Sequence, residues 1–152
     1  MENIRTSYSQ KLLKYFLIVV LGSMLLTLSA KIKIPFYPVP MTMQTFVVLF
    51  LGISLGYKMA VSTVFVYLLE GLLGIPVFSN SPEKGVGLVY FTGPTMGYLI
   101  GFLFAAFISG YLNFQTNFVL IFFKLILSVF FIYLFGVIWL GYLIGWEKPI
   151  FQ

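Results

Sequence analysis

The side chains best suited to specific polar contacts lie in two short segments of an otherwise apolar chain. The first covers residues 34–44 and reads IPFYPVPMTMQ, and the second extends from GIPVFSN at 74–80 to GPTMGY at 93–98. Their hydroxyl and amide groups donate and accept hydrogen bonds without carrying a charge. The candidate groups are those of Thr42, Gln44, Asn80, Thr95 and Tyr98. Chemistry of this kind favours the binding of a ligand over the cleavage of a bond.

Catalysis has few side chains to draw on in this chain. The sequence contains no Cys, no His and no Asp, which removes thiol nucleophiles, imidazole bases and the usual zinc ligand sets. Among the four acids, only Glu70 lies deep within an apolar run, where it would serve as a pocket residue or as a hydrogen-bonded contact between helices. We predict that the chain is not an enzyme and holds no metal or cofactor of its own.

The composition places the chain in a membrane. Of its 152 residues, 61% are hydrophobic and 9% are charged, and the mean hydropathy is +1.05. These values are far from those of a soluble domain with a polar surface. The net charge of +5 comes from scattered lysines and one arginine. Because these cations form no basic tract with interleaved aromatics, we do not expect nucleic acid as a partner.

The apolar runs predict an all-α integral membrane protein with one domain, residues 1–152. A membrane-spanning helix needs about 20 apolar residues, and fewer where flanking lysines extend toward the interface. The predicted spans are residues 15–30, 41–56, 59–77, 88–111 and 118–144. Strands are not expected, because the runs are continuous and longer than barrel strands. Broken backbone within such a protein is tolerated where it lines a cavity, so the two polar segments are where a ligand is expected.

The lysines and the arginine favour, by a small margin, a cytoplasmic N-terminus and a retained first span. This orientation places five cations inside the cell: Arg5, Lys11, Lys14, Lys58 and Lys124. It places four outside: Lys31, Lys33, Lys84 and Lys148. Both polar segments then open to the outer face of the cell membrane.

Small residues recur at helical spacing on three of the predicted spans, and such rows let helices approach backbone to backbone. The fourth span carries a row at Gly93, Gly97, Gly101, Ala105 and Ser109, which we interpret as an internal packing seam. The rows on the first two spans consist of Ser23, Thr27, Ala30, Gly52 and Gly56. These rows favour either internal packing or a docking face for another membrane subunit.

Each candidate in the polar segments also has a structural interpretation. Gln44 would either tie helices together or hydrogen-bond a ligand, since an unbonded amide is costly in a bilayer. Asn80 precedes Ser81 and Pro82 and would serve as a turn residue or a ligand contact. Thr95 follows a Gly-Pro pair and would cap the fourth helix or contact a ligand at its N-terminus.

Four segments taken together resemble the BioY family, the substrate-binding S components of energy-coupling-factor (ECF) biotin transporters. They read IPFYPVPMTMQ at 34–44, YLLEGLLGIPVF at 67–78, GPTMGYLIGF at 93–102 and GVIWL at 136–140. The resemblance covers about residues 12–145. It implies a six-helix bundle with both termini cytoplasmic and with biotin near the outer face beneath the first outer loop. It also implies a membrane coupling subunit and two ATPase subunits as partners, which would use the ATP.

By family position, Gln44, Asn80, Thr95 and Tyr98 become pocket candidates, with Thr42 beside them. Amide and hydroxyl groups suit the ureido ring of biotin, and aromatic walls such as Phe78 or Trp139 suit its thioether ring. The carboxylate tail needs a different partner. The resemblance implies a sixth helix with an Asp and a Lys, which would lie beyond Gln152. The outer lysines are expected to be solvated loop charges.

The sequence therefore predicts the biotin-binding membrane subunit of an ATP-driven vitamin importer, with five of six helices in the printed chain. An S component for another small vitamin is an alternative from the same class. A non-transporting membrane scaffold or remnant, whose glycine rows only mediate assembly, is an alternative from a different class.

Overall fold

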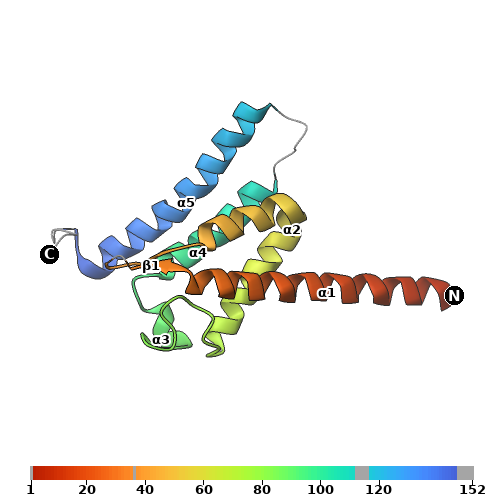
Figure 1. Ribbon diagram of the computed structural model, residues 1–152, viewed down its shortest axis with the longest axis horizontal. Coiled ribbons are helices and arrows are strands. Elements are labelled where there is room, and N and C mark those ends of the chain that lie inside the picture. Colours follow the sequence, from red (N-terminus) through yellow and green to blue (C-terminus); the bar gives the residue numbers. More distant parts are fainter. Residues whose placement is uncertain (1, 36, 112–116, 147–152) are drawn as a thin grey trace.

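The computed structural model describes residues 2–35, 37–111 and 117–146, and they are almost entirely helical (Figure 1). The elements are α1 (Glu2–Lys31), β1 (Lys33–Ile34), β2 (Met41–Thr42), α2 (Gln44–Leu72), α3 (Leu88–Phe91), α4 (Met96–Gly110) and α5 (Phe118–Ile144). In α1, α2 and α5 the described residues include stretches long and apolar enough to cross a membrane, and α4 is a shorter apolar helix. Many leucine and phenylalanine side chains point outward from these helices, as expected for surfaces that face lipid.

The second and third predicted spans form two arms of α2 that meet at Gly56. This glycine has φ 75° and ψ 163°, a conformation open to glycine and strained for other residues. The chain doubles back there, so the two arms lie as a V (Figure 1). The helical part is shorter than the predicted 41–56 and 59–77, because residues 41–42 form β2 and the chain leaves the helix at Leu72. Pro76, which has no amide hydrogen, prevents the helix from continuing to residue 77.

The predicted fourth span, 88–111, is broken. Its first turn is the separate four-residue helix α3, and α4 begins at Met96 after a turn that contains Gly93 and Pro94. Proline disfavours helical geometry in the residue before it and cannot donate to the helix ladder.

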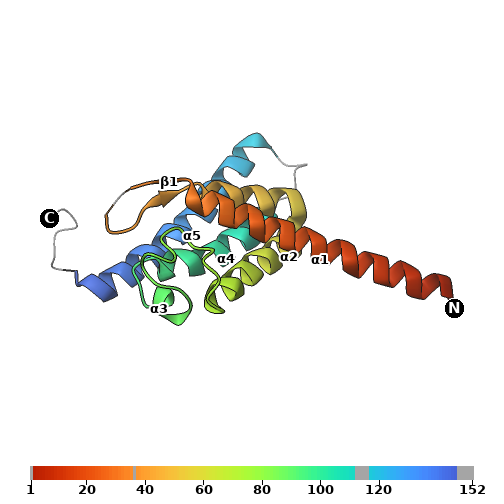
Figure 2. The same cartoon turned by 60° about the horizontal axis from the view of Figure 1, so that its bottom comes forward.

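A short ribbon corrects the expectation of a strand-free chain. β1 and β2 pair antiparallel, with Lys33 opposite Thr42 and Ile34 opposite Met41. β1 follows α1 directly and β2 precedes α2, so their pairing closes the base of the proline-rich loop between the two helices. Figure 2 shows this ribbon at the same end of the bundle as α3 and the C-terminal end of α5, opposite the N-terminus.

The helices pack in sequence order, α1 on α2, α2 on α4 and α4 on α5. Small residues permit the close approaches. A Cβ added at Gly52 would collide with Ser109 Oγ on α4, and one at Gly101 would lie 2.6 Å from Ile132 Cα on α5. The fourth-span row is therefore an internal seam, as predicted. Val48, Val64 and Ala105 are fully or almost fully buried at the centre.

The predicted docking residues on the first two spans are largely internal. Ser23, Ala30 and Gly52 are buried within the chain, whereas Thr27 and Gly56 are half-buried. Packing of α1 on α2 and of α2 on α4 covers these small residues, which favours internal packing at Ser23, Ala30 and Gly52.

Candidate ligand-binding site

A cavity of about 810 Å³ lies where the two polar segments meet. Its walls come from residues 37–42, from Gln44 and Thr45, from Phe78 and Ser79, from Tyr90 and from one face each of α4 and α5. The volume is within the range of small-molecule sites. Most lining groups are apolar or aromatic, and a few hydroxyl and amide groups interrupt them, which is the usual make-up of a site that orients one small ligand.

Gln44 joins the ribbon to the second arm of α2 through a row of hydrogen bonds. Its side-chain oxygen accepts a bond from Thr42 Oγ1 at 3.2 Å, and its Nε2 donates to Tyr67 Oη at 2.7 Å. Tyr67 in turn donates to the carbonyl oxygen of Val77 at 3.2 Å. Gln44 is only 4% exposed and also lines the cavity. Gln44 therefore ties elements together and faces the cavity at once.

Phe78 is the centre of an aromatic cluster at the cavity wall. It stacks on Tyr90 with ring centroids 4.5 Å apart, and it meets Tyr67 and Phe91 edge to face. A Cβ added at Gly71 would collide with the Phe78 ring, so the glycine makes room for it. This wall offers a flat apolar surface of the kind predicted for Phe78.

Thr95 and Tyr98 line the cavity from the first turns of α4. Thr95 is buried, and its side chain makes no capping hydrogen bond, so the predicted capping role is wrong and its hydroxyl is available to a ligand. Tyr98 meets Tyr133 of α5 edge to face at 6.1 Å. Its ring lies against Gly136, where a Cβ would collide with it.

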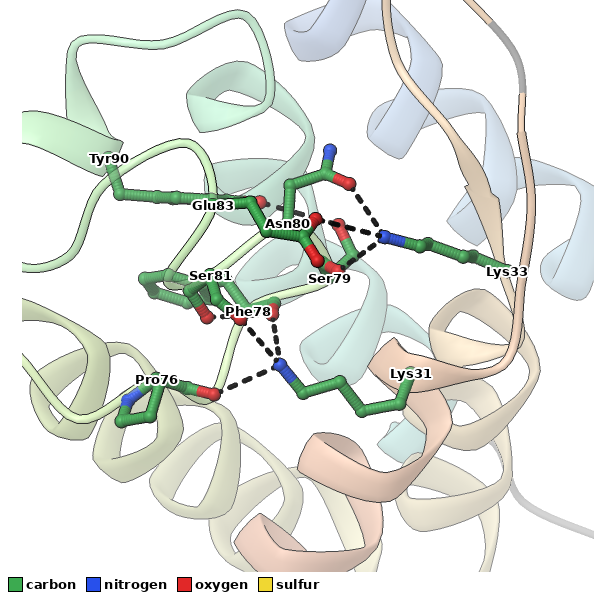
Figure 3. Close-up of polar contacts among 9 residues, drawn as sticks. All are labelled: Lys31, Lys33, Pro76, Phe78, Ser79, Asn80, Ser81, Glu83 and Tyr90. Atoms are coloured by element: carbon green, nitrogen blue, oxygen red, sulfur yellow. Dashed lines mark hydrogen bonds and ion pairs between the residues drawn. The ribbon is translucent and has the colours of Figure 1, made fainter.

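Trp139 and Asn80 do not line the cavity as the described residues define it. Trp139 Nε1 donates to the carbonyl oxygen of Gly93 at 2.9 Å, which turns the indole toward the chain before α4. Asn80 is buried, and its Oδ1 accepts a hydrogen bond from Lys33 Nζ at 2.9 Å (Figure 3). The aromatic wall predicted from Trp139 is instead supplied in part by Trp146.

Two of the four outer lysines are exposed, but they also make several hydrogen bonds that were not expected from the sequence. Lys31 Nζ donates to three carbonyl oxygens in the loop after α2, and Lys33 Nζ donates to Ser79 O and Asn80 Oδ1 (Figure 3). The sequence gives no signal for these bonds, because about 45 residues separate the partners. Lys84 is exposed, and Lys148 lies outside the described residues.

Glu70 lies away from the cavity, in the contact between α1 and α2. It accepts a hydrogen bond from Ser23 Oγ. Of the two interpretations of Glu70, the helix contact is the one that the structure supports.

Of α5, only Trp139 was predicted from the sequence as a wall of the cavity, and the residues of this helix that do line it were missed. Tyr133, Val137, Leu140 and Ile144 line the cavity, and their spacing of three and four residues places them on one helix face. Because α5 is apolar on every side, this face does not stand out in the sequence. Gly136 and Gly141 are small residues on α5, and they could have indicated that this side of the helix packs closely against other parts of the chain.

The arrangement is suited to binding rather than to catalysis. Within residues 2–35, 37–111 and 117–146 there is no group of three or more His, Cys, Asp or Glu side chains placed to hold a metal ion. The lining instead combines aromatic rings with uncharged donors and acceptors. A ligand with an apolar part and a compact polar part fits this combination.

Sequence comparison places the chain among biotin transport proteins. The family described as the BioY family matches residues 3–151. The chain is 34% identical over 131 residues to the probable biotin transporter BioY of Pyrococcus horikoshii, an alignment that covers 86% of this chain and 76% of the relative. It is 44% identical over 88 residues to the biotin transporter BioY of Thermotoga maritima, covering 58% of this chain and half of that relative.

A solved structure has the same fold. The crystal structure of the S-component for biotin from an ECF-type ABC transporter superposes with a TM-score of 0.76 at 25% identity, covering 93% of this chain and 77% of that one. The predicted S-component-like helical membrane fold is confirmed, and the relatives are transporters rather than enzymes. The match over almost the whole chain shows that this multi-pass membrane protein belongs to the BioY family.

Proposed function

We propose that this chain is the biotin-binding subunit of an ATP-driven ECF-type importer and serves biotin uptake. The observation that carries the proposal is the 810 Å³ cavity, which the two polar segments build in a chain of the BioY family. Relatives named as biotin transporters and a structural neighbour titled as an S-component for biotin support it.

The cavity suits the two fused rings of biotin. The ureido ring carries two N–H donors and a carbonyl acceptor, which the lining groups of Gln44, Thr42 and Thr95 can match. The thioether ring is apolar and fits against the stacked rings of Phe78 and Tyr90. The described lining contains no Lys or Arg, so we assign the rings of biotin, rather than its carboxylate, to these walls.

The remaining parts of the proposal concern the surroundings of the chain. Lipid surrounds the exposed apolar faces of the helices, the N-terminus is cytoplasmic, and the cavity opens to the outside of the cell membrane. A membrane coupling subunit and ATPase subunits drive the release of biotin inward and use the ATP, and nucleic acid is not a partner. Thr27 and Gly56, which are half-buried, remain candidates for contact with the coupling subunit.

Equilibrium binding of tritiated biotin to the purified chain in detergent tests the proposal, with riboflavin and thiamine as competitors. We expect saturable binding that unlabelled biotin displaces and that the other two vitamins leave unchanged. Displacement by riboflavin or thiamine would assign the site to another vitamin. Absence of saturable biotin binding in a folded sample would contradict the proposal.

A further inference from the structure

Two lysines hold the loop that follows α2 against the end of α1 and the ribbon. We call Lys31 and Lys33 the lysine clasp. Lys31 Nζ donates to the carbonyl oxygens of Pro76 at 3.1 Å, Phe78 at 2.9 Å and Ser81 at 3.0 Å (Figure 3). An ammonium group has three donors, so Lys31 is fully used in fixing the loop to the helix end.

Lys33 makes a different connection, because it belongs to the ribbon rather than to α1. Its Nζ donates to the carbonyl oxygen of Ser79 at 3.0 Å and to Asn80 Oδ1 at 2.9 Å. Both acceptor residues are buried, and hydrogen bonds with a charged donor are stronger than neutral ones. Glu83 Oε2 lies 4.0 Å from the same nitrogen, but its side chain is 78% exposed, so that ion pair contributes little.

These contacts span two separate walls of the cavity. β1 pairs with β2, and Thr42 opposite Lys33 lines the cavity from the ribbon side. Ser79 lines it from the loop side. Lys33 therefore bridges two segments that each contribute a wall of the cavity.

The hydrogen bond from Lys33 also fixes the orientation of the Asn80 side-chain amide. Because Lys33 binds the amide oxygen, the other end is the N–H₂ group, which can only donate. Figure 3 shows the amide nitrogen turned away from Lys33. Because Asn80 does not line the cavity, this bond serves the connection between the ribbon and the loop.

We propose that Lys33 is a positioning residue that latches the ribbon of β1 and β2 to Ser79 and Asn80 and thereby slows escape of the bound ligand. The proposal rests on the proposed function for the identity of the ligand. The latch itself is a property of the ligand-free chain. It goes beyond the cavity lining because Lys33 does not face the cavity.

The first experiment measures dissociation of tritiated biotin from the purified full chain and from three variants. We expect Lys33→Met to dissociate about tenfold faster, with association changed by less than about twofold, because the lost bonds hold the closed state. Lys33→Arg keeps the charge and the donors and should recover part of the retention. Lys84→Met removes the same charge from an exposed loop position and should match the parent chain.

The second experiment needs no ligand and separates the latch from the identity of the ligand. Hydrogen exchange at the backbone amides of Met43 and Ser81, which donate to the carbonyl oxygens of Ile32 and Phe78, reports local opening in the ribbon segment and the loop segment. We expect Lys33→Met to exchange at least about tenfold faster in both segments, and Lys84→Met to exchange like the parent. If the parent binds no biotin, the proposed function fails while exchange still decides the latch. Unchanged exchange in Lys33→Met, or unchanged dissociation where biotin binds, would overturn the proposal.

Discussion

Replacing Gln44 by methionine tests how the polar wall of the cavity works. Methionine keeps the length and most of the volume of the side chain but removes both hydrogen-bonding groups. In the structure Gln44 accepts from Thr42 Oγ1 at 3.2 Å and donates to Tyr67 Oη at 2.7 Å, and it is 4% exposed. The change therefore leaves the hydroxyl groups of Thr42 and Tyr67 without their amide partner.

The magnitude follows from these contacts. Loss of one partner from a buried hydrogen bond costs about 1–3 kcal/mol. Tyr67 keeps its bond to the carbonyl oxygen of Val77, so the stability cost should lie at the lower end, about 1 kcal/mol. A ligand that bonds to Gln44 directly would lose a similar amount again, and biotin affinity should fall about 10- to 100-fold.

The assay is equilibrium binding of tritiated biotin together with thermal unfolding in detergent. Gln10→Met is the matched control, since Gln10 is exposed on α1 far from the cavity, and it should change neither quantity. Tyr67→Phe separates the structural effect from the ligand effect. It should lower stability while reducing affinity by less than about fivefold. Biotin affinity of Gln44→Met within about twofold of the parent would refute the reasoning.

Three further substitutions test the packing and the walls of the cavity. Gly52→Val forces a side chain into Ser109 Oγ and should destabilise the chain by about 1–3 kcal/mol in thermal unfolding; an unchanged melting temperature would contradict the close contact. Trp139→Phe loses the bond to the carbonyl oxygen of Gly93 and should cost about 1 kcal/mol with biotin affinity nearly unchanged; a large loss of affinity would place the indole in the site. Phe78→Leu shrinks the aromatic wall and should weaken biotin binding about tenfold; full affinity would exclude stacking on this ring.

The helical membrane fold could be predicted from the sequence because hydropathy and helix-breaking residues act locally. The turn at Gly56 is visible where one apolar run ends, and α5 covers the range 118–144 expected from its run. The break before α4 was marked by Gly93 and Pro94, yet the length of the apolar run outweighed this local signal. The start of α4 is set locally, because Pro94 disfavours helical geometry in Gly93, the residue before it.

The candidate site could be predicted in part, because polar side chains are rare in this chain. Within a membrane each of them must be hydrogen-bonded or contact a ligand. Thr42, Gln44, Phe78, Thr95 and Tyr98 do line one cavity. The bonds of the lysine clasp could not be predicted, because a lysine can extend its ammonium several ångströms in many directions. Its partners are backbone carbonyls, which every residue carries.

Small residues were the most ambiguous signal. The same spacing serves helix packing inside the chain and docking outside it, and only the path of α1 decides between them. Ser23 is buried against α2, where it donates to Glu70. A sequence pattern cannot show which side of an all-apolar helix meets another helix of the same chain.

An experimental structure of the purified chain with biotin tests the central claim most directly. We expect biotin inside the cavity formed by residues 37–42, Gln44, Thr45, Phe78 and the facing sides of α4 and α5, with the ureido ring within hydrogen-bond distance of Gln44 or Thr95. Biotin bound at another place on the chain, or an empty cavity at saturating biotin, would contradict it.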